Sequence, residues 1–394
     1  MKIAKISSLV DILNGYALDA RLFNDQGNGT PVVRIRDVMI GKSQTYYSGE
    51  FPPEYIVGPG DLLIGMDGAF DIGVWGYQIA ILNQRVCKIT PKDGLIDKEF
   101  LKYRMSVLLE EVEAKTPFVT VKHLSSEKLK EEQIPLPPLA EQRRIAAILA
   151  RADRLRRLRR YALELSAGYL QAVFAGMFGD ALSGAQGFTA MGDLVTITGG
   201  GTPSRDVPAY FTGTIPWLTS KDMKGEFIYD TEEHVTEEAI AKSATKLVPA
   251  QSILLVVKSK VLMHRLPIAL AKVSLCHGQD IKSIQCQETL APEFLLQVIK
   301  RSEHRLLEQA RGANTEGLTL PMLEEIPVPH IPLPLQQQFA ALARRHERLR
   351  GQQREALRQA EQLFAALLGQ AFRGDLGRRW GLLGGNCAKP SCRF

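Results

Sequence analysis

The chain contains 394 residues, enough for two or three domains that each bury a core of their own. Hydrophobic residues make up 45% of it and charged residues 23%, which is typical of a soluble globular protein. The longest apolar run, SILLVV at 252–257, has the length of a strand, so the composition disfavours a helix that crosses a membrane. The formal net charge of +6 permits nucleic acid as a partner without requiring one.

The N-terminal stretch MKIAKISSLVDILNGY lacks the apolar segment of a signal peptide and carries Asp11. The cysteines show no CxxC spacing; they are Cys87, Cys276, Cys286, Cys387 and Cys392. An odd and irregular set of cysteines favours a reducing compartment and disfavours a zinc site. We therefore expect a cytoplasmic protein that binds no metal.

The sequence repeats itself weakly at an offset of about 190 residues. The matching stretches are GTPVVRIRDV at 29–38 with GTIPWLTSKDM at 213–223, VGPGDLLIGM at 57–66 with VPAQSILLVV at 248–257, LNQRVCKI at 82–89 with HGQDIKSI at 277–284, and KEFLKYRM at 98–105 with PEFLLQVI at 292–299. No single pair is convincing, but their common order and similar offsets indicate an internal duplication.

Each half ends with the same device, a proline-rich strip that leads into a long helical run. The strips are IPLPPLAEQRRIAAIL at 134–149 and IPLPLQQQFAALA at 331–343. Proline holds the preceding chain extended, and the segments after it run without proline to about Phe178 and about Phe372. Apolar residues recur there at intervals of three and four: Ile148, Ala152, Leu155, Leu158, Ala162, Leu165, Tyr169 and Val173, then Leu357, Ala360, Phe364, Leu367 and Ala371. We predict that both stripes form the core of a helix pair, with fraying or a kink of the first helix favoured near Gly168 and Gly176.

The parts before the helices are rich in glycine, proline and short apolar runs, which is typical of short strands with long loops and a few helices. Two such α+β domains, each followed by a long helix, would be held at a fixed separation if the helices pair antiparallel. The two domains would then be related by an approximate twofold axis. DNA with two half-sites suits a pseudo-symmetric protein of this kind.

Four stretches carry a resemblance to a known family. They are PLPPLAEQRRIAAIL at 135–149, VKHLSSEKLKEEQIPLPP at 121–138, GDLLIGMDGAFDI at 60–72 with LNQRVCKI, and GGGTPSRDVPAYFTGTIPWLTSKDM at 199–223. With them, the chain resembles the specificity subunit of type I restriction–modification systems over residues 1 to about 376. In that family two variable target-recognition domains each read half of a bipartite DNA site. The conserved helices fix the spacer and dock methyltransferase subunits.

The resemblance implies a fold of two tandem, pseudo-repeated α+β domains whose following helices pair as an antiparallel coiled coil. We expect target-recognition domain 1 at 1–138, spacer helix 1 at 139–180, target-recognition domain 2 at 181–333, spacer helix 2 at 334–376 and a C-terminal tail at 377–394. The implied partners are double-stranded DNA, methyltransferase subunits, of which two are expected per chain, and restriction/translocase subunits. S-adenosylmethionine, ATP and Mg are expected on those subunits, so that this chain carries no cofactor and catalyses nothing itself.

The residues agree with a non-catalytic role. The sequence has no GxGxxG that opens a helix, no GxxxxGK[ST], no HExxH and no GxSxG. GGGTPS at 199–204 lacks the lysine of a phosphate loop, and FPPEY at 51–55 lacks the acid of the adenine-methyltransferase signature [DN]PP[YF]. Two alternatives stay open: a stand-alone DNA-binding regulator that needs no partner, and an enzyme with an unrecognised site.

Candidate DNA contacts are loop residues whose side chains suit base edges or phosphates. In the first domain they are Arg34, Arg36, Lys42, Tyr46 and Tyr47 after the NDQGNGT loop, and Asp67 and Asp71 beside Phe70 and Trp75. In the second they are Thr202, Ser204, Arg205 and Tyr210, then Ser220 and Lys221, then Lys258, Lys260, His264 and Arg265. For any one of them a solvated loop residue is the simpler interpretation. Trp75 and Trp217 are expected to pack, and Gln84 and Gln279, present in both halves, to be structural.

The arginine-rich stretch RADRLRRLRR at 151–160 has three interpretations. It could be a solvated helix face, a docking surface for an acidic partner, or a contact with the phosphates of the spacer, which would steepen the salt dependence of binding. The second proline strip, PLQQQFAALA, differs from PPLAEQRRIAAIL, so we expect two helices that are not equivalent. The tail has no match in either repeat.

Overall fold

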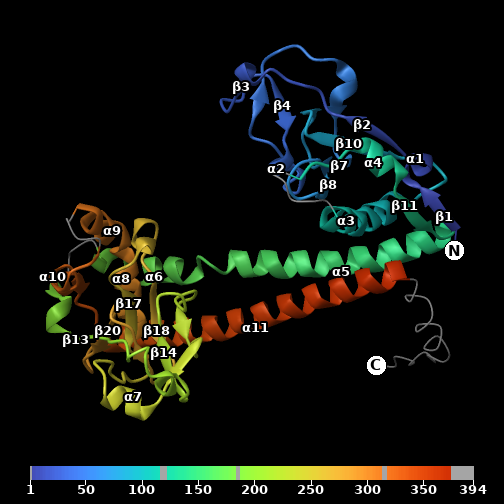
Figure 1. Cartoon of the computed structure of the whole chain (residues 1–394). Helices are drawn as coiled ribbons and strands as arrows, with labels where there is room; N and C mark the ends of the chain where they lie inside the picture. The colour runs from blue at the N-terminus through green and yellow to red at the C-terminus, as the bar shows by residue number, and fades with distance from the viewer. Residues whose placement is uncertain (1, 116–121, 183–186, 313–316, 374–394) are drawn as a thin grey trace, which may run out of the picture. The chain divides into compact units, whose positions relative to one another are not determined.

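The computed structural model describes residues 2–115, 122–182, 187–312 and 317–373 (Figure 1). The chain forms two compact units, Met1–Tyr161 with Glu355–Phe394, and Ala162–Arg354. Helices α5 (Leu139–Leu165) and α11 (Leu333–Arg373) each contribute one part to each unit. The expected tail at 377–394, with Cys387 and Cys392, lies outside the described residues.

The first unit is built from short strands and four helices beside the helix pair. Its strands are β1 (Lys2–Lys5), β2 (Val10–Asn14), β3 (Phe23–Asn24), β4 (Thr30–Val33), β5 (Tyr46–Tyr47), β6 (Ile56–Val57), β7 (Leu62–Gly65), β8 (Ile72–Val74), β9 (Ala80–Leu82), β10 (Val86–Pro91) and β11 (Gln133–Leu136). Its helices before α5 are α1 (Ile6–Leu9), α2 (Ile35–Val38), α3 (Lys98–Lys115) and α4 (Ser126–Glu131). The sheets have the orders β1-β11, β2-β10-β7-β8 and β3-β5-β4-β9-β6.

The second unit repeats this plan. Its strands are β12 (Phe188–Ala190), β13 (Val195–Gly199), β14 (Ile215–Leu218), β15 (Phe227–Ile228), β16 (Glu233–Val235), β17 (Ile253–Val256), β18 (Ile268–Ala271), β19 (Cys276–His277), β20 (Ile281–Cys286) and β21 (Pro327–Pro329). Its helices are α6 (Tyr169–Asp180), α7 (Glu237–Ala241), α8 (Pro292–Arg301), α9 (Glu303–Gly312), α10 (Leu320–Glu324) and the first part of α11. The sheets have the orders β12-β21, β13-β20-β17-β18-β15 and β16-β14-β19.

The two topologies share the order of their central strands, which confirms the predicted α+β duplication. The order β2-β10-β7-β8 of the first unit matches β13-β20-β17-β18 of the second. The parallel pair β4 with β9 corresponds to the parallel pair β14 with β19, and the second unit also pairs β15 with β18 in parallel. The runs LLIG and ILLV, which the repeat aligned, form the central strands β7 and β17, and all eight of their residues are buried. Strands buried on both faces read as continuous apolar runs rather than alternating ones.

The two long helices lie antiparallel in each unit. In the first unit, Arg160 on α5 donates to Glu361 on α11 over 2.6 Å, and the Arg156 guanidinium lies 3.9 Å from the centre of the Phe364 ring. Residues with increasing numbers along α5 thus contact residues with decreasing numbers along α11. The second unit keeps this direction, because Ser166 after α5 bonds Gln353 over 3.2 Å and the Tyr169 ring stacks on His346 at 5.0 Å. The predicted antiparallel pairing is confirmed.

The first helical run is two helices rather than one reaching Phe178. Helix α5 ends at Leu165, and α6 begins at Tyr169 with Gly168 as its N-cap. Helix α6 belongs to the core of the second unit, where the Phe174 and Phe178 rings pack against Phe294 at 5.5 and 5.1 Å. Gly168, one of the two glycines at which the sequence favours fraying or a kink, therefore lies where the helix is interrupted.

The predicted apolar stripe of the first helix is wrong in part. Leu155, Leu158, Leu165 and Tyr169 are exposed, Leu158 by 54% and Leu165 by 66%. The buried face of α5 lies elsewhere: Gln142, Ile145, Ala146, Leu149, Ala152 and Asp153. An apolar spacing identifies a helix face but not which of two apolar faces a domain covers. On α11 the prediction is confirmed at Ala360, Phe364 and Ala371, which are buried.

Buried glutamines fasten each proline strip to its domain. The Gln142 Oε1 accepts from the backbone of Asp97 over 2.8 Å, and its Nε2 donates to the Pro137 carbonyl over 2.9 Å. At the same place in the second unit, Gln336 accepts from the Ala291 N–H over 2.9 Å and donates to the Ile331 carbonyl over 2.8 Å. Each amide satisfies buried backbone groups on both sides of the hinge, so it fixes the angle at which the helix leaves its domain. We refer to these two residues as the glutamine latches.

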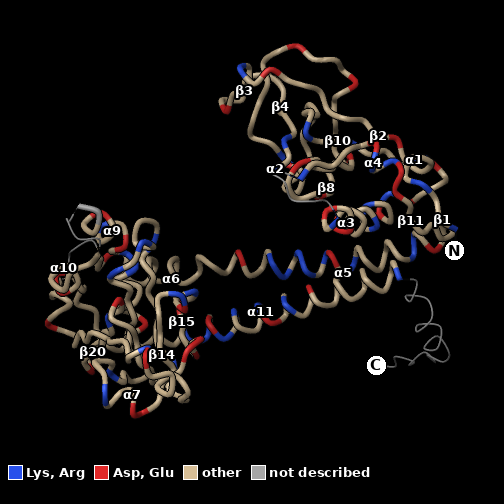
Figure 2. The backbone as a smooth tube through the Cα atoms, in the orientation of Figure 1, with Lys and Arg blue, Asp and Glu red and all other residues tan. Residues whose placement is uncertain are grey.

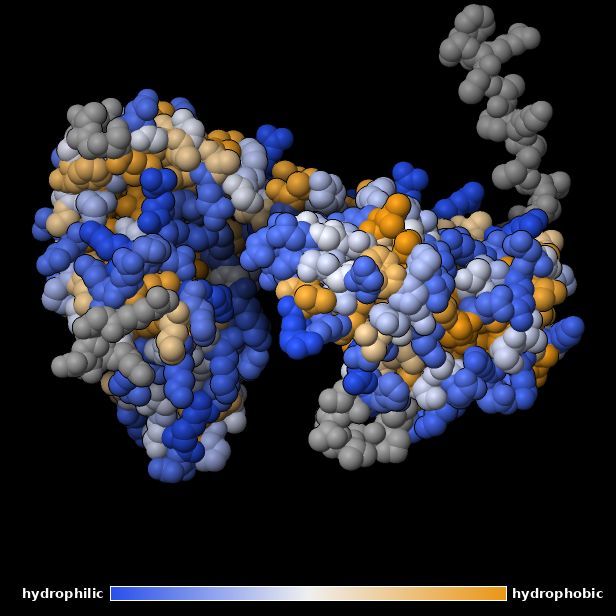
Figure 3. All heavy atoms as spheres, turned by 90° about the horizontal axis from the view of Figure 1, so that it is seen from above, coloured by the Kyte–Doolittle hydropathy of each residue, from blue (hydrophilic) through white to orange (hydrophobic). Residues whose placement is uncertain are grey.

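No helix of the described residues is long and apolar enough to cross a membrane. The space-filling view shows hydrophobic residues interspersed with hydrophilic ones over the visible face of each unit (Figure 3).

Candidate functional site

The two domains present a basic residue on the same turn. In the first, the Asp37 carboxylate accepts from the backbone N–H of Arg34 over 3.0 Å, and Arg36 lies between them in the chain. In the second, the Asp222 carboxylate accepts from the backbone N–H of Thr219 over 2.9 Å, with Lys221 at the position of Arg36. An aspartate that closes the turn on its own backbone holds the neighbouring side chain in a fixed direction. The duplication therefore places one cation, Arg36 or Lys221, at equivalent points of both domains.

In the first domain Arg36 lines a hollow of about 530 Å³. Its lining is Asp25, Gln26, Gly27, Arg36, Gln44, Thr45 and Tyr46, and the Arg36 Nη2 donates to the Thr45 hydroxyl over 3.1 Å. Tyr47 points the other way, into the core, where its ring meets Phe23 edge-on at 5.8 Å, because successive strand residues face opposite sides. The structure thus brings Arg36 and Tyr46 together and separates Tyr47 from them. Guanidinium, amide and phenol groups around a hollow are able to donate to and accept from base edges.

The other first-domain candidates lie around this hollow or apart from it. Lys42 and Asp71 are exposed, and Arg34 is partly buried at the start of α2. Asp67 forms a separate cluster: its carboxylate meets the Arg85 Nη1 at 3.1 Å and the His123 Nδ1 at 2.6 Å. Trp75 is buried and its indole donates to the Gln78 carbonyl over 2.6 Å, which confirms its packing role.

Arg205 of the second domain is engaged within its own surface. Its Nη2 donates to Glu233 over 2.7 Å, and its guanidinium lies 4.2 Å from the centre of the Phe211 ring and 5.1 Å from that of Trp217. The hydrogen bonds raise the pKa of Arg205 and lower the pKa of Glu233 from their ordinary values. Trp217 is buried, donates to the Gly201 carbonyl and packs as predicted.

The three second-domain groups form one continuous region. The Asp222 carboxylate of the Lys221 turn accepts from the backbone N–H of Glu232 over 3.1 Å, directly beside Glu233, the partner of Arg205. On the other side, the Arg265 Nη2 donates to the Met223 carbonyl over 3.2 Å, which ties the loop of Lys258, Lys260 and His264 to the turn of Lys221. The remaining candidates are Thr202, Ser204 and Lys221, which are exposed, and Ser220 and Tyr210, which are partly buried.

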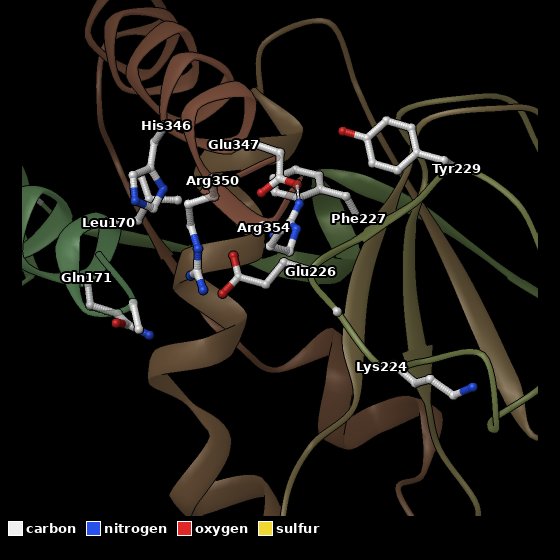
Figure 4. A pocket seen from close by; sticks show the side chains of 12 residues that line it. Leu170, Gln171, Lys224, Glu226, Phe227, Tyr229, His346, Glu347, Arg350 and Arg354 are labelled. Atoms are coloured by element: carbon white, nitrogen blue, oxygen red, sulfur yellow. Dashed lines mark hydrogen bonds and ion pairs between the residues drawn. The ribbon is translucent and has the colours of Figure 1, made fainter. Parts of the chain in front are cut away.

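A further hollow of about 520 Å³ lies beside this region, between α6, the start of β15 and α11 (Figure 4). Its two carboxylates already have cations, Glu226 from Lys300 and Glu347 from Arg354. The Arg350 side chain extends from α11 into the middle of the hollow, and its buried Nε has no hydrogen-bond partner among the described residues. The Lys224 ammonium points away from the hollow and pairs with Glu232.

The arginine-rich stretch of α5 is partly paired with its own helices. Asp153 holds Arg156 at 2.7 Å and Arg157 at 3.2 Å, and Arg160 reaches Glu361. Arg151, Arg154 and Arg159 are exposed, and Figure 2 shows the positions of lysine and arginine in blue along the tube of α5. Arg156 and Arg157 are therefore paired within α5, Arg160 is paired across to α11, and Arg151, Arg154 and Arg159 present exposed charge that suits an anionic surface.

The structure adds residues that the sequence did not single out. Gln26 and Gln44 stand in the first hollow, and Arg85 and His123 flank Asp67. Gln26 belongs to the NDQGNGT loop and Gln44 follows it, so their residue type and their position in the sequence indicate candidate DNA contacts. Arg85 and His123 come from distant segments, and sequence spacing gives no sign that they meet. Within the described ranges, no cluster of histidine, cysteine and acidic residues is arranged to hold a metal ion.

Known proteins resemble the chain in both sequence and fold. The family model of the type I restriction modification DNA specificity domain matches residues 1–164 and again 187–358. Over 152 residues the chain is 45% identical to the EcoBI specificity subunit of Escherichia coli, covering 38% of this chain and 32% of that protein. Over 146 residues it is 35% identical to the EcoR124I/EcoR124II specificity subunit of the same species, covering 36% of each. The matches thus span about a third of the length of these relatives.

Solved structures share the fold over nearly the whole chain. The S subunit of a type I restriction-modification system from M. genitalium superposes with a TM-score of 0.65 at 16% identity, covering 94% of this chain and 96% of that one. A chain from a study of complex assembly and conformational transition of the type I R-M system gives 0.53 at 18% identity, covering 95% and 98%. The duplicated domains seen here are therefore two copies of one recognised module, and the chain belongs to the family of type I restriction modification DNA specificity domains.

Proposed function

We propose that the chain is the DNA-recognition subunit of a type I restriction–modification complex. Each domain reads one half of a bipartite double-stranded target, and the paired helices set the gap between the halves. The observation that carries this proposal is a duplicated scaffold with different polar surfaces: the same turn presents Arg36 in one domain and Lys221 in the other, among neighbours that differ. Two half-sites of different sequence require this combination.

The proposed contacts divide into two kinds. Phosphate contacts, which position the protein, come from exposed lysines such as Lys42 and Lys260. Base contacts come from side chains that a domain holds in one direction, such as Arg36 and Tyr46 in the first hollow. Arg205 is a weaker candidate for base reading, since Glu233 already occupies its guanidinium.

The chemistry of the complex belongs to its partners in this proposal. Methyltransferase subunits, two for each chain, carry S-adenosylmethionine, and restriction/translocase subunits carry ATP and Mg. The chain is non-catalytic and brings these subunits to the target. The exposed arginines and leucines of α5, Arg151, Arg154, Leu155 and Leu158, suit a protein partner better than a solvated face, because the apolar side chains gain from being covered. Membership of the family weighs against a regulator that works alone.

The test is a map of modified adenines. The chain is expressed with the methyltransferase subunit encoded beside it, and the methylome is read by single-molecule sequencing. We expect one bipartite motif with a fixed gap, absent when the chain is omitted. An assembled and active methyltransferase that gains no new motif from the chain would contradict the proposal.

A further inference from the structure

One backbone junction recurs in both domains at the end of the central strand. After β7 the Met66 N–H donates to the Arg85 carbonyl over 3.0 Å, and the Leu124 N–H donates to the Met66 carbonyl over 2.7 Å. After β17 the Val257 N–H donates to the Asp280 carbonyl over 2.9 Å, and the Leu318 N–H donates to the Val257 carbonyl over 2.8 Å. The same two hydrogen bonds thus join three separate segments in each domain. They make residues 66, 85 and 124 equivalent to 257, 280 and 318.

The side chains at this junction reverse their charges between the domains. Asp67 in the first domain corresponds to Lys258 in the second, since each follows the shared strand directly. Arg85 corresponds to Asp280. His123, which precedes Leu124, corresponds to Gly317. A side chain needed to hold the junction together would keep its chemistry in both copies, as the glutamine latches do. Reversed charges on an unchanged backbone instead indicate a surface that faces a different ligand in each domain.

The first-domain junction is a prearranged set of donors. The Asp67 side chain is 18% exposed, whereas those of Arg85 and His123 are each 55% exposed. Asp67 accepts from the His123 Nδ1 and binds the Arg85 Nη1, so one partly buried carboxylate orients two exposed groups. Among the described residues, the guanidinium keeps its Nε and Nη2 edge for another partner, and the imidazole keeps its Nε2. An arginine edge with two N–H groups matches the O6 and N7 acceptors of guanine, a pairing that discriminates between bases.

We propose that Arg85, oriented by Asp67, reads a guanine in the half-site of the first domain, and that His123 contacts the neighbouring base pair. The proposal rests on the proposed function and specifies it: the first half-site contains a guanine recognised by its acceptor edge. In the second domain, Lys258 and Asp280 present a different arrangement of hydrogen-bond donors and acceptors, so we expect a different base preference at the equivalent position of the second half-site. Asp67 is a positioning residue, because both of its oxygens are occupied by Arg85 and His123.

The experiment uses the complete complex with its methyltransferase and compares methylomes of four chains. They are the unchanged chain, Arg85→Ala, Arg85→Lys and Lys258→Ala. We expect Arg85→Ala to lower the preference for guanine at one position of one half-site by about tenfold or more, and to leave the other half-site and the gap unchanged. Arg85→Lys keeps the charge but loses the two-pronged edge, so the same position relaxes. Lys258→Ala, at the equivalent place, changes the other half-site and spares the first.

Salt dependence separates base reading from phosphate binding. If Arg85 contacts a phosphate, Arg85→Ala weakens all sequences equally and lowers the slope of log affinity against log salt by about 0.9, whereas Arg85→Lys restores both. That outcome overturns the proposal, as does an effect of Arg85→Ala and Lys258→Ala on the same half-site. A guanine preference that survives Arg85→Ala, in a complex whose unchanged chain yields a bipartite motif, also overturns it while leaving the proposed function intact.

The fold of the variants is checked separately. Asp67→Asn keeps the shape of the side chain but weakens its hold on Arg85 and His123. We expect it to relax the same half-site position as Arg85→Ala, with a thermal unfolding midpoint close to that of the unchanged chain, since Arg85 and His123 are exposed. Arg85→Ala combined with Asp67→Asn should relax that position no further than Arg85→Ala alone. Additive losses at different positions would contradict the positioning role of Asp67.

Discussion

The two domains differ where they face outward and agree where they hold themselves together. Both close a turn with an aspartate, Asp37 or Asp222, and both fasten the helix with a buried glutamine latch. At the surface of the first domain, Arg36 lines an open hollow. In the second domain, Arg205 is paired with Glu233 and lies over two aromatic rings. Duplication thus supplies one scaffold twice, and the polar side chains placed on it are free to diverge.

The largest expected effect comes from shortening the helix pair. Deleting 154–160 from α5 together with 360–366 from α11 removes about two turns and preserves the faces of both helices to within about 20°. This shortens the pair by about 10 Å, equivalent to about three base pairs of DNA. We expect a methylome with both half-sites unchanged, a shorter gap and no modification of the original target. A changed half-site would contradict the separation of spacing from reading.

Loss of a glutamine latch should destabilise the unit that contains it. Gln142→Leu leaves the N–H of Asp97 and the carbonyl of Pro137 buried without partners, which lowers the free energy of unfolding by about 3 kcal/mol. Gln336→Leu has the equivalent effect in the second unit. Hydrogen exchange followed by mass spectrometry measures each unit separately. We expect each variant to lose protection in its own unit.

The matched control is Gln352→Leu, an exposed glutamine on α11, which should change neither unit. If Gln142→Leu and Gln336→Leu loosen both units alike, the latches do not act locally.

Arg205→Ala should affect one half-site by a moderate amount. Its ion pair with Glu233 is exposed, so its loss lowers the free energy of unfolding by about 1 kcal/mol or less. Any larger effect of the substitution is therefore an effect on DNA binding. We expect weaker or relaxed preference in one half-site and an intact preference in the other, measured by methylome and by DNA titration. Glu233→Gln removes the same ion pair while keeping Arg205. An equal effect from Glu233→Gln would assign Arg205 to the support of Phe211 and Trp217 rather than to reading.

The smallest expected effect is a pH dependence confined to the second unit. His277 is fully buried, its Nε2 has no partner among the described residues, and burial together with Lys282 lowers its pKa below the ordinary value of 6.5. Below pH 6.5 the unfolded chain takes up a proton that the folded domain refuses, so stability falls as the pH falls toward the lowered pKa. Thermal unfolding is measured between pH 7.5 and 5.5 for the unchanged chain and for His277→Leu, in which leucine matches Leu82 at the aligned position of the first domain. We expect the stability of the second unit to fall more steeply with decreasing pH in the unchanged chain than in the variant. His304→Gln, an exposed histidine, should behave as the unchanged chain.

The sequence predicts much of this fold for physical reasons. Buried central strands appear as the apolar runs LLIG and ILLV, and proline strips mark where each helix begins, so the duplication and the antiparallel pairing are confirmed. The face of α5 is not predictable from spacing, because Leu155 and Leu158 have the same period as the buried Ala152 and Leu149. Which face is covered depends on the domain that packs there.

The candidate site is harder to predict than the fold. Arg36 and Tyr46 line the same hollow because they are close in the chain, and the preceding NDQGNGT loop indicates a polar loop at this place. Asp67, Arg85 and His123 meet across segments far apart in the sequence, and a pairwise contact of that kind has no local pattern. Their equivalence to Lys258, Asp280 and Gly317 becomes visible through the backbone hydrogen bonds of the junction.

The most direct test of independent reading by two copies of one scaffold uses the equivalent cations Arg36 and Lys221. Methylomes are recorded for complexes that contain Arg36→Ala, Lys221→Ala or the unchanged chain. We expect each substitution to weaken or relax one half-site, the two substitutions to affect different halves, and the gap to stay constant. If both substitutions alter the same half-site, or if either one alters both halves, the two domains do not read independently and the account is contradicted.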